Sequence, residues 1–356
     1  MAYTNIDDPS AHFQVALHSS ANAATITNDG NSDLQPDFIW SKARGAAYIH
    51  GLYDSTRGVT KFLQSNTTSA EGTASAGFDL TSFNTNGFST GNNQFNTICA
   101  GTTYVAWQWK ANGGTTSTNN DGNRTSTVQV NTDAGFSIVT YDGATLAGQT
   151  IGHGLGQRPD VVMIKRTNST GSFIVWTSSL TSGAFLQLAL TNAEFVQSRI
   201  YQAGMTTTTF GVGANGTTSL NGSSYVAYCF ASKQGYSKFG KYVGNGATDG
   251  PFVYTGFKPA FVMIKNASAT ESWVMFDSKR SPFNAADLKL SSDTADSENN
   301  NSAIGGAAYN NIDILSNGFK CVTNNAATNG SGNTLIYMAF AENPFTTSTG
   351  VPTTAR

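Results

Sequence analysis

Pro159-Asp-Val-Val-Met-Ile-Lys165 is a run of apolar residues that follows a proline and ends in a lysine. The same pattern occurs at Pro36-Asp-Phe-Ile-Trp-Ser-Lys42 and at Pro259-Ala-Phe-Val-Met-Ile-Lys265. A short apolar run beside a proline is typical of a buried strand, because proline is tolerated where a strand begins but not at its centre. The three copies therefore predict an internal repeat, and a repeat decides the architecture of the whole chain.

A second aromatic strand follows each proline strand at a similar distance. Its three versions are Tyr104-Val-Ala-Trp-Gln-Trp109, Tyr225-Val-Ala-Tyr-Cys-Phe230 and Leu335-Ile-Tyr-Met-Ala-Phe340. Two independent motifs that keep nearly the same separation three times are hard to produce by chance. We therefore interpret the chain as three diverged copies of one module.

Turn signals recur between the two motifs. An aromatic residue precedes a polar turn at Tyr53-Asp-Ser55, Trp176-Thr-Ser178 and Phe276-Asp-Ser278. Further along, Asn86-Gly87 and Asn317-Gly318 predict tight hairpins, because Asn and Gly accept the positive φ angles that such turns require.

The repeat and the composition of its connections predict the domain boundaries. The predicted parts are module 1 at residues 1–112, a Gly/Thr/Asn-rich linker at 113–130, module 2 at 131–234, module 3 at 235–345 and a polar C-terminal tail at 346–356. Almost no chain separates modules 2 and 3, so we expect these two to pack rigidly. The tail is small and polar, and we expect it to fray in an isolated chain.

Side-chain alternation indicates the fold class. In residues 104–109, Val105, Trp107 and Trp109 point to one face of the strand and Ala106 to the other, so both faces carry apolar residues. A strand covered on both sides suits a sandwich packed against a neighbour. Short strands separated by Gly, Asn and Ser turns predict an all-β fold of three tandem antiparallel β-sandwich modules, jelly-roll-like. The best helical candidate is the short segment 281–290.

The composition excludes several classes of protein. Charged residues make up 12% of the chain and the formal net charge is -2, which excludes a basic nucleic-acid binder. Hydrophobic residues reach 39%, enough to build a core, so the chain is not disordered. No apolar run approaches the roughly 18 to 20 residues of a membrane span, and we expect no membrane insertion.

The N-terminus and the cysteines bear on where the chain is made. Residues 1–9 have neither the basic start nor the apolar stretch of a signal peptide, so we expect synthesis in a cytoplasm. Cys99, Cys229 and Cys321 are odd in number and lack the spacing of a zinc site. We therefore expect neither a disulfide framework nor a structural zinc.

Few residues suggest chemistry. The four histidines, His12, His18, His50 and His153, occur in no metal-binding or nucleophile-activating spacing. Residues 152–156 (Gly-His-Gly-Leu-Gly) could approach a ligand, but a turn into the Pro159 strand explains them better. Residues 211–216 match GxGxxG without the helix that a dinucleotide site needs. Residues 119–123 resemble a calcium loop without its bidentate Glu, which favours a linker turn.

Two aspartates stand at matching positions in copies one and three. Asp54 precedes Arg57, and Asp277 precedes Arg280, whereas residues 177–180 of copy two carry no charge. Loss of both charges together favours a local turn ion pair, worth about 0–1 kcal/mol if it is exposed. The alternative is a catalytic aspartate in one copy, since β-scaffold glycosidases use paired carboxylates. Aromatic residues at loop tips could also stack on sugar rings.

Several of these motifs resemble a family of uncharacterised virion proteins of marine tailed bacteriophages, and the similarity spans nearly the whole chain. The motifs are the opening Tyr3-Thr-Asn-Ile-Asp-Asp-Pro-Ser10, Ser32-Asp-Leu-Gln-Pro-Asp-Phe-Ile-Trp40, residues 104–109, 152–156 and 225–230, Gly250-Pro-Phe-Val-Tyr-Thr-Gly-Phe257 and Tyr337-Met-Ala-Phe-Ala-Glu-Asn-Pro-Phe345. The resemblance implies a structural protein of the phage particle, with family descriptions that range from tail fibre to generic structural protein. It supplies no catalytic residues.

Together these observations predict a non-enzymatic virion protein with no catalytic, cofactor-binding or metal-binding residues. We expect a tail-associated fibre or adhesin that contacts the host surface; the alternatives are a capsid decoration protein and, third, a glycan depolymerase. The expected partners are further copies in a trimer or ring, other tail or capsid proteins and host cell-surface glycan, with no nucleic acid. Its receptor-binding residues are not predicted.

Overall fold

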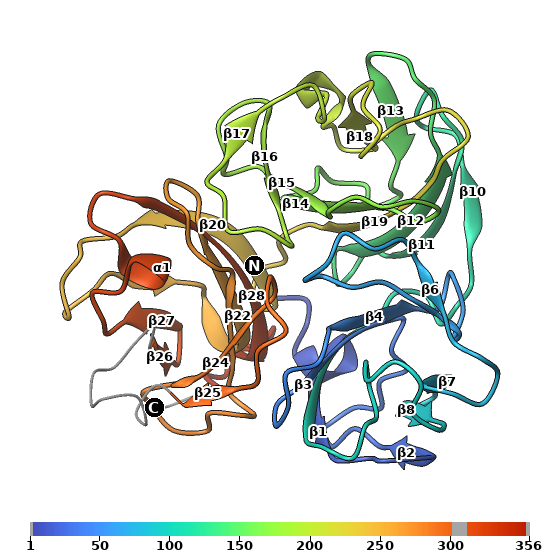
Figure 1. Ribbon diagram of the computed structural model, residues 1–356. Coiled ribbons are helices and arrows are strands. Elements are labelled where there is room, and N and C mark those ends of the chain that lie inside the picture. The colour runs from blue at the N-terminus through green and yellow to red at the C-terminus, as the bar shows by residue number, and fades with distance from the viewer. Residues whose placement is uncertain (1–2, 301–311, 354–356) are drawn as a thin grey trace.

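Regular structure in the chain is almost entirely β (Figure 1). The computed structural model describes residues 3–300 and 312–353. Within these ranges the only helices are α1 (Ala326–Asn329) and the 3₁₀ turns η1 (Pro9–Ala11) and η2 (Gln202–Gly204). The predicted all-β class is confirmed. The helical candidate at 281–290 is wrong, because this segment holds no helix and ends in strand β24 (Leu288–Ser291).

Residues 1–112, the first segment, form a principal sheet and a smaller facing sheet. The principal sheet has the order β1 (Phe13–His18), β9 (Tyr104–Trp109), β3 (Phe38–Ala43) and β4 (Gly51–Asp54). The smaller one has the order β2 (Ala24–Ile26), β8 (Gly87–Thr90) and β7 (Leu80–Asn84), and a separate pair joins β5 (Lys61–Phe62) to β6 (Gly72–Thr73). Side chains of both sheets, among them Ile39 and Phe88, share one apolar core, so they form a sandwich.

Residues 113–234, the second segment, contain the largest sheet. Its order is β10 (Ser117–Asn119), β11 (Ser126–Asn131), β12 (Phe136–Asp142), β19 (Ser224–Phe230), β14 (Val161–Arg166), β15 (Ile174–Thr177), β16 (Ala184–Gln187) and β17 (Phe195–Val196). The pair β13 (Gln149–Gly152) and β18 (Thr209–Val212) packs on it. Trp176 of the large sheet and Phe210 of the pair belong to one core.

Residues 235–345, the third segment, repeat the arrangement. The principal sheet has the order β20 (Ser237–Val243), β28 (Thr334–Pro344), β22 (Phe257–Asn266), β23 (Val274–Asp277), β24 and β25 (Asn299–Asn300). The smaller sheet has the order β21 (Phe252–Tyr254), β27 (Gly318–Cys321) and β26 (Ile312–Leu315). Phe276 and Phe319 lie in the core between them.

The three principal sheets share one strand order. In each, the proline strand lies between the aromatic strand that ends the segment and the strand that follows the proline strand in sequence. The register also matches: Phe38 pairs with Trp109, Val161 with Phe230 and Phe261 with Phe340. The described strands thus repeat one order and one register, while the division into three independently folding modules stays a prediction.

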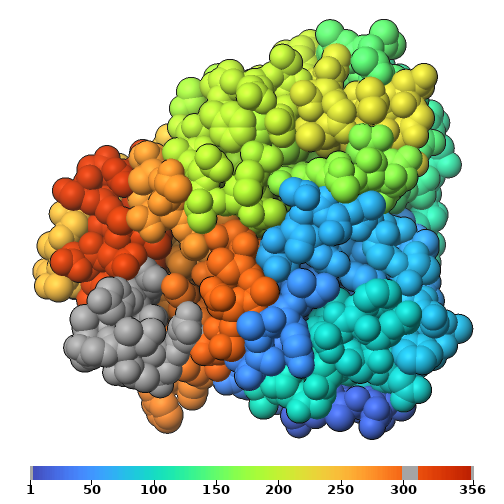
Figure 2. Space-filling view, viewed as in Figure 1, coloured from blue at the N-terminus to red at the C-terminus, as the bar shows by residue number. Residues whose placement is uncertain are grey.

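One aromatic core joins the three sheets. Alternate side chains of the aromatic strands point away from their own sandwich and meet in a central cluster of buried residues. It includes Phe13, Phe38, Trp107, Trp109, Phe136, Tyr228, Phe230, Phe261, Met338 and Phe340. Phe38 of the first segment stacks on Tyr228 of the second, with 4.2 Å between the ring centroids. Phe13 of the first segment stacks on Phe340 of the third, with 5.2 Å between the centroids. Figures 1 and 2 show the resulting arrangement of three packed lobes.

The segment predicted as a linker, residues 113–130, carries strand β10 and most of β11. Its start is held by the buried carboxylate of Asp37, which accepts hydrogen bonds from the backbone N–H groups of Ala111, Gly113 and Gly114 at 2.7–2.9 Å. The polar composition therefore reflects an edge of the large sheet. At the other end of the chain, Ser348 binds the Asp7 carboxylate, which ties part of the tail down.

The lysine that ends each proline strand is buried and donates to backbone carbonyls. Lys42 binds the carbonyl of Ala295 at 3.0 Å, and Lys265 binds that of Thr191 at 3.0 Å, each in another segment. Lys165 binds the Gly171 carbonyl within its own segment. Burial lowers the pKa of all three to about 8. In two of the three copies, the lysine that ends the motif thus helps to fasten the segments together.

Among the described residues, no helix has the length and apolar character needed to cross a membrane.

The predicted Asn-Gly hairpins form, but their turns lie one residue earlier than expected. Thr85 and Asn86 occupy the turn between β7 and β8, and the positive φ of +97° belongs to Gly87, the first residue of β8. A Cβ atom at Gly87 would lie 2.0 Å from the carbonyl oxygen of Ile26. This glycine is therefore required both by its conformation and by a close backbone approach.

We expect Gly87→Ala to lower the free energy of unfolding by about 1–3 kcal/mol, because it adds a clash to a left-handed backbone. Gly58 is the matched control, with a φ of +95° and no atom within 4 Å of the place that a Cβ would take. Gly58→Ala should lower the free energy of unfolding only by the cost of placing an alanine in a left-handed backbone conformation. Urea unfolding of both variants measures the difference, and equal losses would contradict the assigned clash.

Candidate functional site

The four histidines are structural in their surroundings. His50 accepts a hydrogen bond from the Trp40 indole N–H at 2.9 Å, and its other ring nitrogen lies 3.0 Å from the carbonyl of Ser291 in the third segment. Burial, with a smaller contribution from Lys42, lowers the pKa of His50 to about 3. The neutral ring therefore bridges two segments.

The other three histidines lie elsewhere. His18 stacks on Tyr104 at 5.4 Å, and His153 accepts the Leu155 backbone N–H at 3.1 Å. Burial lowers the pKa of both rings to about 4, and it also lowers that of His12, which contacts Asn131. Among the described residues, no three His, Cys, Asp or Glu side chains gather as a metal site would require.

The loops with motif-like sequences form turns. In residues 152–156, Gly154 and Gly156 have φ angles of +72° and +71°, and the segment leads into β14 as predicted. Residues 211–216 leave β18 for a turn and reach β19 without a helix, so the dinucleotide geometry is absent there. In residues 119–123, Asn119 and Asp121 bind each other.

The cysteines are free and buried. Burial raises the pKa of Cys99 to about 12 and that of Cys321 to about 11, and it also raises that of Cys229. A thiol must ionise to act as a nucleophile, so these three side chains behave as small apolar groups at neutral pH.

The two Asp–Arg pairs are local, as predicted, but they are buried and reach other segments. Asp54 binds Arg57 at 2.6 Å and accepts the hydroxyl of Tyr228, in the second segment, at 2.7 Å. Burial alone would lower the pKa of Arg57, but Asp54, Tyr228 and Glu71 together outweigh it and raise that pKa. The small stabilisation expected of an exposed ion pair therefore does not apply to this buried one.

The second pair repeats the geometry at another junction. Asp277 binds Arg280 at 2.5 Å and accepts the indole N–H of Trp107, in the first segment, at 3.0 Å. Arg280 also pairs with Glu298 at 2.9 Å, which in turn binds Arg44. Both aspartates thus accept a hydrogen bond from a donor on the aromatic strand of another segment. This contact gives each of them a structural role.

The uncharged version in copy two now has a physical explanation. Tyr228 and Trp107 occupy the fourth position of their aromatic strands, and the same position in the third segment is Met338, which has no donor. The residues matching Asp54 and Arg57 are Thr177 and Leu180, and Leu180 packs on the central cluster that contains Met338. The donor on the aromatic strand and the Asp–Arg pair in the matching turn are therefore present together in two cases and absent together in the third.

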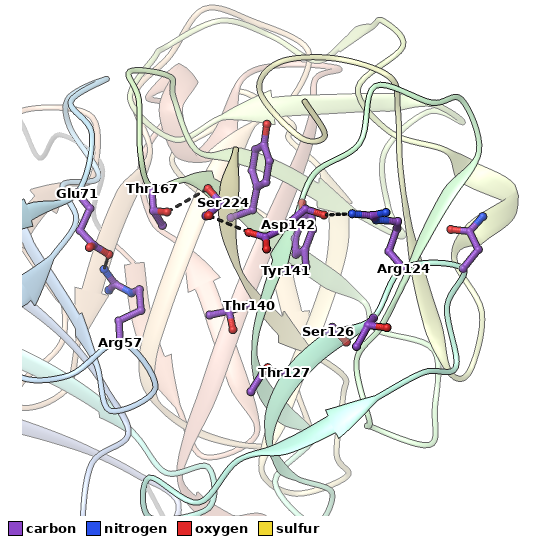
Figure 3. Close-up of a pocket in the computed structure, with 13 residues that line it drawn as sticks. Arg57, Glu71, Arg124, Ser126, Thr127, Thr140, Tyr141, Asp142, Thr167 and Ser224 are labelled. Atoms are coloured by element: carbon purple, nitrogen blue, oxygen red, sulfur yellow. Dashed lines mark hydrogen bonds and ion pairs between the residues drawn. The ribbon is translucent and has the colours of Figure 1, made fainter. Parts of the chain in front are cut away.

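A polar groove lies where the first and second segments meet, with a volume of about 640 Å³. One wall is the Arg57–Glu71 ion pair of the first segment, at 2.9 Å. The other side belongs to the second segment. On that side the groove is lined by the hydroxyl, guanidinium and carboxylate groups of Arg124, Thr127, Thr140, Asp142, Thr167 and Ser224 (Figure 3).

Strands β11, β12 and β19 position these side chains. Thr127 and Thr140 are register partners on β11 and β12, so their side chains share one face of the sheet. Arg124 precedes β11, and its guanidinium donates to the backbone carbonyl of Asp142 at 3.3 Å. The Asp142 carboxylate accepts the Ser224 hydroxyl at 2.8 Å.

Sequence patterns alone do not single out these groove residues. Arg124 and Thr127 lie in the segment whose composition predicts a linker, and Asp142 ends a strand whose pattern indicates only a core role. The available signal is the polar–apolar alternation of Thr127, Val128, Gln129 and Val130 in the sequence; in the structure Thr127 is exposed and Val128 buried, while Gln129 is buried as well. Such alternation is typical of a half-buried strand.

Comparison with known proteins places the chain in a family. A family model described as a domain of unknown function, DUF7483, matches residues 8–344. The chain belongs to this family. The DUF7483 match begins before β1 and ends with the last residue of β28, so it spans all three principal sheets. No curated protein and no solved structure matches the chain.

Proposed function

We propose that this DUF7483 protein is a non-enzymatic structural protein of a bacteriophage particle, a tail-associated fibre or adhesin that contacts the host surface. The observation that carries the proposal is the fusion of three sandwiches on one aromatic core. Such a core fixes the lobes relative to one another and leaves their loops at the periphery. A rigid scaffold that presents many loops suits weak multivalent contacts with a surface.

Two further features support a building role. The Asp–Arg pairs and two of the three buried motif lysines, Lys42 and Lys265, make contacts between segments, so these charged groups have structural partners. The resemblance of the sequence motifs to virion proteins of tailed phages supplies the biological context. Assembly with further copies or with other tail proteins belongs to the same proposal.

The position of the chain on the particle tests this proposal. We expect a cryo-electron microscopy map of the phage to show its three-lobed density on the tail, and we expect labelled purified protein to bind host cells. Density at regular positions on the head, with a fixed number of copies per capsid, would instead make it a decoration protein. Absence from purified particles would overturn both.

A glycan depolymerase is the enzymatic competitor, because Glu71 and Asp142 both line the groove. Glycosidases need one carboxyl group as acid and a second as base or nucleophile. Here the Glu71 carboxylate is shared between Arg57 at 2.9 Å and Lys61 at 3.4 Å, and Asp142 binds Ser224. These contacts hold the walls of the groove, which favours binding without cleavage.

The enzymatic competitor has its own test. We expect no release of reducing ends when the protein is incubated with surface polysaccharide from the host. Release that disappears in Glu71→Gln and Asp142→Asn would show an enzyme and refute the non-enzymatic role.

A further inference from the structure

We propose that the groove between the first and second segments binds an uncharged oligosaccharide. The inference rests on the proposed adhesin function and deepens it, since it names the site and the chemical class of the receptor. The groove volume of about 640 Å³ lies within the usual range of ligand clefts.

The charges of the groove balance. Its lining contains two cationic side chains, Arg57 and Arg124, and two anionic ones, Glu71 and Asp142. Arg57 and Glu71 already neutralise each other at 2.9 Å. A phosphate or an acidic sugar would have to approach Asp142 and Glu71, so the lining favours a ligand without net charge.

Hydrogen-bonding capacity remains open on the second segment's side. One oxygen of Asp142 accepts from Ser224, and one terminal nitrogen of Arg124 donates to a backbone carbonyl. The other carboxylate oxygen, the other guanidinium N–H groups and the hydroxyls of Thr127 and Thr140 make no hydrogen bond to the described parts of the chain. The groove therefore offers both free donors and free acceptors to a ligand.

That pattern suits a ligand whose neighbouring groups each donate and accept. Adjacent hydroxyls of a sugar ring do both, so one ring can satisfy a carboxylate and a guanidinium together. An apolar ligand would leave the same groups desolvated and unpaired, at a large cost in affinity. The lining thus selects a polyhydroxylated compound over an apolar one.

The groove is also preorganised. The backbone N–H of Arg124 binds the Thr150 carbonyl at 3.2 Å, and Thr127 and Thr140 stand on paired strands inside the large sheet. On the facing wall, Arg57 is fixed by Asp54 and by the Leu52 carbonyl. Groups that are already in place lose little entropy when a ligand binds, which makes a modest number of polar contacts effective.

The test measures binding of a defined panel by titration calorimetry. The panel holds neutral di- and trisaccharides of glucose, galactose, mannose and N-acetylglucosamine, together with counterparts that contain glucuronic or neuraminic acid. We expect saturable binding of at least one neutral member. Asp142→Asn and Arg124→Ala should each weaken it about tenfold or more, because each removes charge-assisted hydrogen bonds.

Two controls keep the result specific. Thr127→Val keeps the shape of an exposed side chain and removes one hydroxyl, so it should weaken binding without affecting folding. Asp33→Asn changes an exposed carboxylate outside the groove lining and should leave binding unchanged. Binding of no neutral member, preference for the acidic counterparts, or equal binding by the groove variants would each overturn the proposal.

Adsorption of labelled protein to host cells separates this inference from the function on which it rests. Cell binding that is lost in Asp142→Asn and Arg124→Ala supports both. Cell binding that both variants retain leaves the adhesin function standing and refutes the groove as its receptor site. Failure of the unaltered protein to bind cells or saccharides refutes both.

Discussion

Arg57→Leu is expected to lower the free energy of unfolding by about 3–5 kcal/mol, the usual cost of removing one partner of a buried ion pair. The Asp54 side chain is fully buried and that of Arg57 is 6% exposed. Without Arg57, the Asp54 carboxylate keeps the Tyr228 hydroxyl as a partner but has no compensating positive charge. Glu71 is less affected, because it is partly exposed and retains Lys61.

The uncharged residues at the matching positions of the other segments supply the matched control. The triple variant Asp54→Thr, Arg57→Leu and Tyr228→Met copies the set Thr177, Leu180 and Met338. We expect it to be more stable than Arg57→Leu alone, because it leaves no buried charge behind. The triple variant should also lose less free energy of unfolding than the three single variants lose in sum, because the three residues form one contact network.

Urea unfolding followed by tryptophan fluorescence measures the three single variants and the triple variant. A loss below about 1 kcal/mol for Arg57→Leu would mean that the pair behaves like an exposed one. Strict additivity in the triple variant would show that Tyr228 does not act together with the Asp–Arg pair, contrary to the contacts that join them at the junction.

The repeat makes much of the fold predictable. The proline strands, the aromatic strands and their similar separation can be recognised from the local sequence pattern, and residues 104–109 carry apolar side chains on both faces. That pattern correctly indicates a sheet covered on both sides. The structure adds what covers it: Trp107 and Trp109 enter a core that the other segments also build.

Contacts between segments cannot be predicted from a local sequence pattern. The sequence shows that copy two loses the charges of both Asp54 and Arg57, but it cannot show the donor that each aspartate meets. Tyr228 lies far from Asp54 in sequence, and only the packing of the lobes brings them together. Without that packing, the pair has only the small energy that applies to exposed charges.

The groove cannot be predicted from the sequence for a related reason. The Thr, Asn and Gly content of residues 113–130 is shared by loops and by edge strands with one polar face. Arg124 and Asp142 become neighbours only because β11 and β12 pair as a hairpin. Composition says nothing about pairing, so the site follows from topology alone.

Acid should destabilise the protein through its buried histidines. The pKa of His50 is lowered to about 3, and those of His18 and His153 to about 4, in each case mainly by burial. In the unfolded chain a histidine takes up a proton near a pH of about 6.5. Below that value the unfolded state binds more protons than the folded state, so stability falls as the pH falls.

The expected size follows from the number of protons. Each of these histidines should remove about 1.4 kcal/mol of stability per pH unit once the pH is well below about 6.5, until its folded pKa is reached. Above that pH neither state binds these protons, so their contribution should be flat there. Three such groups together should make the free energy of unfolding fall steeply between about pH 6 and pH 5.

His50→Gln isolates one of the three contributions. Glutamine can accept from Trp40 and donate toward the Ser291 carbonyl, as His50 does, but it does not titrate. We expect the variant to be less stable at neutral pH, because the amide does not reproduce the ring's packing. Its stability should nevertheless fall less steeply below a pH of about 6.5, by about 1.4 kcal/mol per pH unit. Urea unfolding at a series of pH values gives both slopes. If the slopes coincide, His50 is not the buried neutral bridge between the first and third segments, and the acid sensitivity arises elsewhere.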